Sequence, residues 1–182
     1  MTVIAGEADG AATTVNPAGL GLLGGVSGVL AAALSDPAGG RRGGGAGAFL
    51  GAPIGGRIFG RRGAPLFAVG AAFQWLRSGP VGALGPALGG IERPFPQVTL
   101  ALAVPLMRWV PGLSVGLAYS RLGSVQNPYA DGLDSVDVGV SYRLHRAIAL
   151  GVVGRGLNLP RAGPALGSGR PLFQPLEIDP EV

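Results

Sequence analysis

Residues 134–157, DSVDVGVSYRLHRAIALGVVGRGL, alternate between apolar side chains and small or polar ones on both sides of a short basic segment. In the first arm the apolar set is Val136, Val138, Val140, Tyr142 and Leu144, separated by Ser135, Asp137, Gly139, Ser141 and Arg143. In the second arm Ile148, Leu150 and Val152 alternate with Ala149, Gly151, Val153 and Arg155. A period of two is typical of a β-strand with one apolar face. The segment therefore predicts a β-hairpin with its turn at residues 143–146.

The same pattern recurs along the chain. Strands are expected at residues 22–34, 43–55, 66–75, 98–106 and 113–120, and residues 176–182 begin a further one. From the third strand onward the connections alternate between long and short, as they do in up-and-down outer-membrane barrels. Arms of roughly ten residues match a tilted strand that crosses a bilayer. The predicted fold is all-β, an antiparallel up-and-down meander of about seven or eight strands that makes a transmembrane β-barrel or a partial barrel.

The composition supports apolar surface outside a core. The chain has 35 glycines and 16 prolines, but only 13% of its residues are charged, and its mean hydropathy is +0.42. Disordered chains this rich in Gly and Pro are normally polar. A coding bias toward Gly, Ala, Arg and Pro explains part of the glycine content, but it does not create alternation.

The charge pattern does not favour a nucleic-acid partner. All basic residues are arginine, and the net charge of +4 is spread along the chain rather than gathered in a stripe. Two doublets, Arg41-Arg42 and Arg61-Arg62, lie in Gly-rich turns, where solvation or contact with anionic head groups is the expected role.

Enzymatic signals are weak, and we expect no catalytic activity and no cofactor. The chain lacks cysteine, and its one histidine, His145, lies in the basic turn, so neither a Cys nucleophile nor a His-based triad is favoured. Gly45-x-Gly47 lacks the Lys or acidic partner of a nucleotide loop. Asp131, Asp134 and Asp137 would at most bind Ca²⁺ weakly, with turn formation the preferred role; no metal site is expected.

The hairpin predicts which side chains face lipid and which face a lumen. Val136, Val138, Val140, Tyr142, Ile148, Leu150 and Val152 should meet lipid. The candidate lumen-facing residues are Asp137, Arg143 and Arg155, because an Arg facing lipid near the midplane costs about 2–4 kcal/mol. An ion pair between Asp137 and Arg155 on neighbouring strands is geometrically possible, and a structural pairing is favoured over a substrate contact. The other inward positions are Gly, Ala and Ser, which leave room for a plug or an apolar cargo.

Aromatic residues should mark the two membrane interfaces. In the expected meander, Trp75 and Tyr119 fall near the outer strand ends, and Trp109 and Tyr142 fall near the inner ends.

Two other architectures stay open. Residues 18–35 carry no charge for eighteen positions and are long enough for a single membrane-spanning helix, although the glycines there disfavour one. The second alternative is a soluble or surface β-sheet module with a structural or interaction role.

Residues 7–20, EADGAATTVNPAGL, resemble the N-terminal segment of bacterial outer-membrane barrels of the long-chain fatty-acid and hydrocarbon transporter family. The matching motif residues are Asn16, Pro17 and Leu20, with Ala18 and Gly19 between them and Asp9 upstream. The resemblance implies a plug-like lead-in at residues 1–20, a barrel from residue 21 to 182, and passive uptake of small apolar molecules. The resemblance also implies a barrel of about fourteen strands, so a chain with seven strands and the start of an eighth is expected to be truncated. We also expect membrane lipid as a partner, together with self-association or additional barrel strands.

The resemblance also implies a bacterial outer-membrane location. No signal peptide is visible in MTVIAGEADG, where Glu7 and Asp9 interrupt the pattern of such a signal. Similar barrel-like segments precede proteases resembling signal-peptide peptidases. Such proteases use a Ser/Lys pair, which this lysine-free chain does not contain. In that setting the chain would anchor a larger protein to the membrane.

Overall fold

The computed structural model describes residues 8–35, 43–55, 65–77, 95–123, 133–145 and 148–158. Two short helical elements come first, the α-helix α1 (Ala12–Val15) and the 3₁₀ helix η1 (Pro17–Leu22). Seven strands follow: β1 (Ser27–Ser35), β2 (Gly43–Ile54), β3 (Phe67–Arg77), β4 (Phe95–Pro105), β5 (Leu113–Leu122), β6 (Asp134–His145) and β7 (Ile148–Gly154). They form one sheet in sequence order, and each strand is antiparallel to the next. The predicted all-β meander is confirmed.

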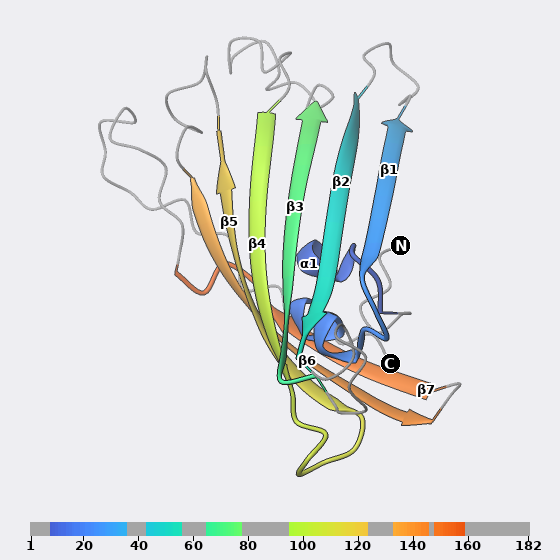
Figure 1. Cartoon of the computed structure of the whole chain (residues 1–182). Helices are drawn as coiled ribbons and strands as arrows, with labels where there is room; N and C mark the ends of the chain where they lie inside the picture. Colours follow the sequence, from blue (N-terminus) through green and yellow to red (C-terminus); the bar gives the residue numbers. More distant parts are fainter. Residues whose placement is uncertain are drawn as a thin grey trace.

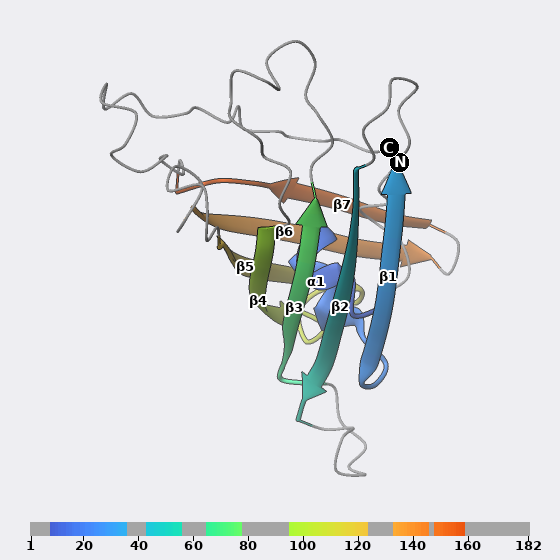
Figure 2. The same ribbon diagram turned by 90° about the horizontal axis from the view of Figure 1, so that it is seen from above.

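The sheet curls into a half-barrel. In Figure 1, β1 to β4 stand upright while β5 to β7 sweep behind them. Figure 2 shows α1 on the concave side of the sheet, inside the curl of the strands. Among the described strands, β1 pairs only with β2 and β7 pairs only with β6. The described part of the sheet is therefore not closed between β1 and β7.

In the hairpin of residues 134–157, the apolar side chains and the small ones lie on opposite faces of the sheet. Tyr142 pairs with Leu150 and Val140 pairs with Val152, and Val140, Leu150 and Val152 are exposed on the convex side. Gly139, Ser141 and Gly151, which alternate with them, are buried. β6 extends to His145, so residues 143–145, which were predicted to lie in the turn, belong to the strand.

The start of the first strand was predicted wrongly. Residues 22–26 are not strand: Leu22 ends η1, and β1 begins only at Ser27. The cause is the local sequence around Asn16-Pro17, which starts a helical turn. The Asn16 side chain accepts a hydrogen bond from the Ala18 N–H, and proline occupies the first position of η1. Leu20 and Leu23 are then buried, as core side chains of the turn.

The spanning-helix alternative at residues 18–35 is wrong. This stretch is divided between η1 and β1. In the part of the chain that the structure describes, no helix is long and apolar enough to cross a membrane.

The two faces of the sheet differ in side-chain size. The convex face carries large exposed apolar side chains from every strand, including Leu30, Leu50, Val69, Phe73, Leu100, Leu102, Leu117, Val138, Leu150 and Val152. The concave face carries small ones in transverse rows. One row runs through Gly51, Gly70, Ala101 and Ala118 as successive register partners. The next runs through Ala68, Ala103, Gly116, Gly139 and Val153.

Candidate functional site in the concave face

Residues 8–26, which we call the inner segment, occupy the concave side of the sheet. α1 and η1 lie inside the curl (Figure 1, Figure 2), and η1 contacts strands β2 to β6. Leu20 is fully buried and forms the core together with Leu23, Ala68, Ala101, Ala103 and Ala118. The small concave rows therefore accommodate a segment of the same chain.

Gly116 and Gly139 let the inner segment approach the sheet closely. A Cβ on Gly116 would overlap the backbone of Pro17 and Ala18, and a Cβ on Gly139 would overlap the amide oxygen of Asn16. Protein interiors leave no spare volume for an added methyl group at such contacts. Glycine at these two register partners is thus required by the position of η1.

Polar contacts fix the inner segment as well. The Asn16 Nδ2 donates to the Val140 carbonyl at 3.2 Å, while its Oδ1 accepts from the Ala18 N–H at 3.1 Å. At the opposite side of the curl, the Gly10 N–H donates to the Ser27 Oγ at 3.1 Å. Within the described residues, no buried side-chain nitrogen or oxygen lacks a hydrogen-bond partner. Hydrogen bonds to β1 and β6, which lie far apart in the sequence, therefore hold the inner segment in place.

A third concave row carries the polar hydroxyl groups of the site. Phe49, Ala72, Thr99, Ser120 and Ser135 are successive register partners from β2 to β6. The Thr99 and Ser120 hydroxyls hydrogen-bond each other at 2.9 Å and are buried. This row contains no charge, so it offers apolar and hydroxyl surface.

The ion pair that the sequence favoured between Asp137 and Arg155 is absent, which corrects that interpretation. Asp137 accepts hydrogen bonds from the Ser135 hydroxyl at 2.8 Å and the Gly156 N–H at 3.0 Å. Arg155 donates instead to the Val15 carbonyl of the inner segment at 3.3 Å. The reason is the chain path: β7 ends at Gly154, and Gly156 adopts a φ of 63°, which turns its N–H toward the carboxylate.

The three candidate lumen-facing residues lie in different surroundings. Asp137 and Arg155 are half-buried, and Arg155 reaches the inner segment. Arg143 shares its side of β6 with the buried Gly139 and Ser141, but it lies near the strand end and is exposed. The structure does not bring these three charges together into one site.

The motif residues Asn16, Pro17 and Leu20 have physical roles in seating the inner segment. Asn16 caps η1 and bonds to β6, Pro17 begins η1, and Leu20 fills the core. Sequence reasoning missed Thr13, whose buried hydroxyl donates to the Gly10 carbonyl at 2.8 Å. The sequence did offer one signal for it. Residues 11–14, AATT, lie just before Asn16-Pro17 and show no strand alternation, which is compatible with a short helix there.

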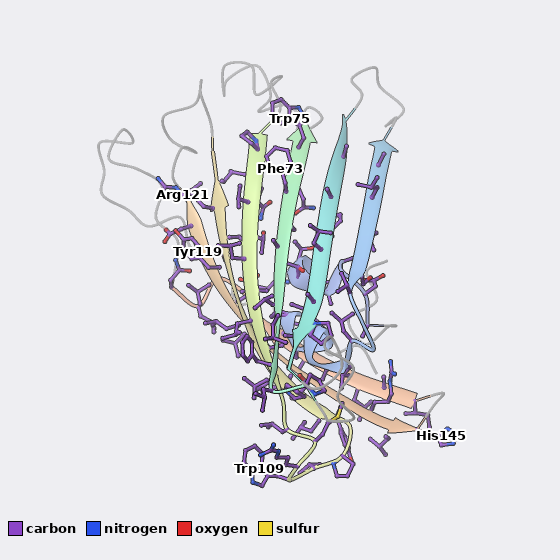
Figure 3. The ribbon with its side chains drawn as sticks, in the orientation of Figure 1. Phe73, Trp75, Trp109, Tyr119, Arg121 and His145 are labelled. Atoms are coloured by element: carbon purple, nitrogen blue, oxygen red, sulfur yellow. The ribbon has the colours of Figure 1, made fainter. Side chains whose placement is uncertain are left out.

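Other candidate groups do not assemble. The described residues contain no cluster of three or more His, Asp or Glu able to hold a metal ion. His145 lies at the end of β6 that faces away from Trp75 (Figure 3). Asp131, the doublets Arg41-Arg42 and Arg61-Arg62, and residues 176–182 lie outside the described residues.

Comparison with protein-family models, with curated proteins and with solved structures finds no match to this chain. The likeness of residues 7–20 to outer-membrane transporters therefore stays a prediction from the sequence.

Proposed function

We propose that this chain is part of an outer-membrane β-barrel that allows small apolar molecules to pass passively, with its convex face in lipid. The observation that carries the proposal is the continuous apolar convex face. Leu30 is 86% exposed and Leu100 is 57% exposed, and comparable side chains project from every strand. Soluble monomers rarely expose contiguous apolar patches beyond a few hundred Å².

Strand length supports a membrane setting. Strands β2 to β6 contain 10 to 12 residues each, which is about the length needed for a tilted strand to cross the hydrocarbon layer. Trp75 and Trp109 project near opposite ends of the sheet (Figure 3), and both are exposed. Tryptophan side chains favour the two membrane interfaces.

The concave rows support an apolar cargo. They consist mainly of Gly, Ala, Ser and Thr, with the apolar residues Phe49, Pro53 and Val153 and the amides Gln74 and Gln97, and Asp137 is the one acidic residue at an inward position of the described strands. Water-filled porin lumens are polar. The inner segment covers these rows, so it acts in this proposal as the plug of the pathway.

Tryptophan depth measurements test the membrane setting. The chain has two tryptophans, so Trp75→Phe and Trp109→Phe each leave one reporter. After refolding into vesicles that contain lipids brominated at shallow or deep acyl positions, both reporters should be quenched more by the shallow bromines. A third reporter, Leu100→Trp in the double Phe background, should be quenched more by the deep ones because residue 100 is midway along β4.

The outcome separates the proposal from its alternatives. No quenching at all, with full solubility in the absence of detergent, would indicate a soluble β-sheet module. Correct depths without transport would indicate a membrane anchor for a larger protein. Transport is measured as uptake of an apolar fluorescent probe by cells that display the chain, against a hydrophilic probe of similar size; only the apolar probe should enter faster.

A further inference from the structure

The two ends of the half-barrel differ in charge. At the end where β5 ends and β6 begins, Arg121 lies directly opposite Asp134 in the register, so basic and acidic groups are mixed there. The other end, where β4 ends and β6 ends, carries Arg108 and Arg143, both exposed. We call this second end the turn end.

No described carboxylate lies at the turn end. Asp134 begins β6 at the opposite end. Asp137 is bonded to Ser135 and Gly156. Asp9 belongs to the inner segment, where it accepts from the Ala11 N–H at 2.8 Å. The described connection between β4 and β5 at this end, residues 106–112, contains Arg108 and no acidic residue.

A backbone hydrogen bond joins the β4–β5 turn to the end of β6. The Arg143 N–H donates to the Gly112 carbonyl at 3.0 Å. Gly112 has a φ of 82°, and a side chain there would overlap the Arg143 carbonyl. This close contact holds Arg143 beside the turn that carries Arg108 and Trp109.

Apolar side chains accompany the two arginines. Trp109 is 75% exposed, and Met107 and Val110 beside it are exposed as well. Figure 3 shows Trp109 projecting from the tip of the turn, away from the body of the sheet. A guanidinium group binds phosphate oxygens through paired N–H donors, while an exposed indole partitions into the lipid interface.

We propose that the turn end, formed by Arg108, Trp109 and Arg143, binds the phosphate groups of anionic phospholipids in the adjacent membrane leaflet. This inference rests on the proposed membrane setting and adds a preference for the charge of the lipid. It also assigns an orientation, with the turn end at the leaflet richer in anionic phospholipid.

Vesicle binding tests the inference. The refolded chain is titrated with neutral phosphatidylcholine vesicles and with vesicles that also contain phosphatidylglycerol, and binding is followed by Trp fluorescence. Wild type should bind the anionic vesicles more tightly. Arg108→Gln with Arg143→Gln should lower the ratio of anionic to neutral affinity by about fivefold per arginine, and the same loss should appear at high salt.

Control variants test whether the arginines of the turn end cause the preference for anionic vesicles. Arg121→Gln removes one arginine at the opposite end and should leave the ratio unchanged, while Arg108→Lys with Arg143→Lys should largely retain it. Circular dichroism checks that all variants keep the strand signal. Inorganic phosphate at constant ionic strength should not displace the chain, because a membrane surface presents many head groups together with an interface for Trp109.

Three results would overturn the inference: an equal affinity of wild type for both vesicles, an unchanged ratio in the double Gln variant, or displacement by inorganic phosphate. Binding to neutral vesicles reports on the proposed membrane setting separately. A chain that binds neither vesicle fails both proposals, whereas a chain that binds both equally fails only this one.

Discussion

At the residue scale, the absence of a side chain at Gly139 allows the inner segment to lie against β6. Replacing Gly139 with alanine places a methyl group on the Asn16 amide oxygen and within 3.1 Å of the Pro17 Cδ. Overpacking of this kind costs about 1–3 kcal/mol. We expect Gly139→Ala to lower the free energy of unfolding by that amount, measured by denaturant titration of the refolded protein in detergent.

Gly28→Ala is the matched control for this prediction. Gly28 is also a strand glycine, but its added Cβ would meet only the Leu50 Cδ2 at an ordinary 3.4 Å. It should leave stability unchanged within about 0.5 kcal/mol or raise it slightly. Equal losses of stability in Gly139→Ala and Gly28→Ala would show that the position of the inner segment does not depend on the absence of a side chain at Gly139.

Strand alternation predicted small inward residues, but the plug-like lead-in at residues 1–20 was expected only from the resemblance, and its contacts with the sheet were not predicted. Alternation alone placed Gly116, Gly139 and Ala101 on one face, because strand geometry is local. That the backbone of Pro17 and Ala18 lies against Gly116 depends on contacts between residues about a hundred positions apart. No local pattern encodes such a contact.

At the element scale, the pairing of β6 continues beyond the end of β7 through a side chain. The Val136 N–H donates to the Asn158 Oδ1 at 2.9 Å, and the Asn158 Nδ2 donates to the Asp134 carbonyl at 3.0 Å. Asn158→Ala removes both bonds, each worth about 0.5–1.5 kcal/mol. We expect faster amide hydrogen exchange at Val136, measured by NMR in detergent, with little change in the middle of β6.

Asn158→Asp distinguishes the two bonds. Aspartate keeps an acceptor for the Val136 N–H but loses the donor to Asp134. Protection at Val136 should therefore survive in Asn158→Asp. If Asn158→Ala leaves the exchange of Val136 unchanged, the ladder does not depend on this side chain.

The ends of the strands could be predicted only where the buried and exposed side chains follow the alternation of the sequence. The strands β3 to β7 were predicted with small errors at their ends because alternating apolar residues there face a single environment. The strand prediction at residues 22–26 failed for a different reason. Leu23 is buried against the sheet as part of a turn, so an apolar residue at this position did not indicate a strand. The Asp137–Arg155 pair failed because the chain leaves the strand geometry at Gly154.

At the scale of the whole molecule, the convex face should tolerate charge differently in lipid and in water. Leu100 is midway along β4 and exposed on this face. Leu100→Arg should destabilise the chain in bilayers by about 2–4 kcal/mol, measured by denaturant titration in vesicles. Leu66→Arg, just before β3 begins, should cost only about 0–1 kcal/mol. A soluble module would tolerate both substitutions.

The seven strands alternate in direction and are paired in sequence order, so β1 and β7 run the same way. The two edge strands of the described sheet therefore have identical polarity. A second copy related by a twofold axis along the barrel would meet them in parallel seams, which pair slightly less well per residue. Antiparallel closure instead requires an insert that begins and ends on strands of the opposite direction, and such an insert always contains an odd number of strands. The direction of β1 and β7 therefore fixes whether the number of strands that could close the ring in an antiparallel way is odd or even.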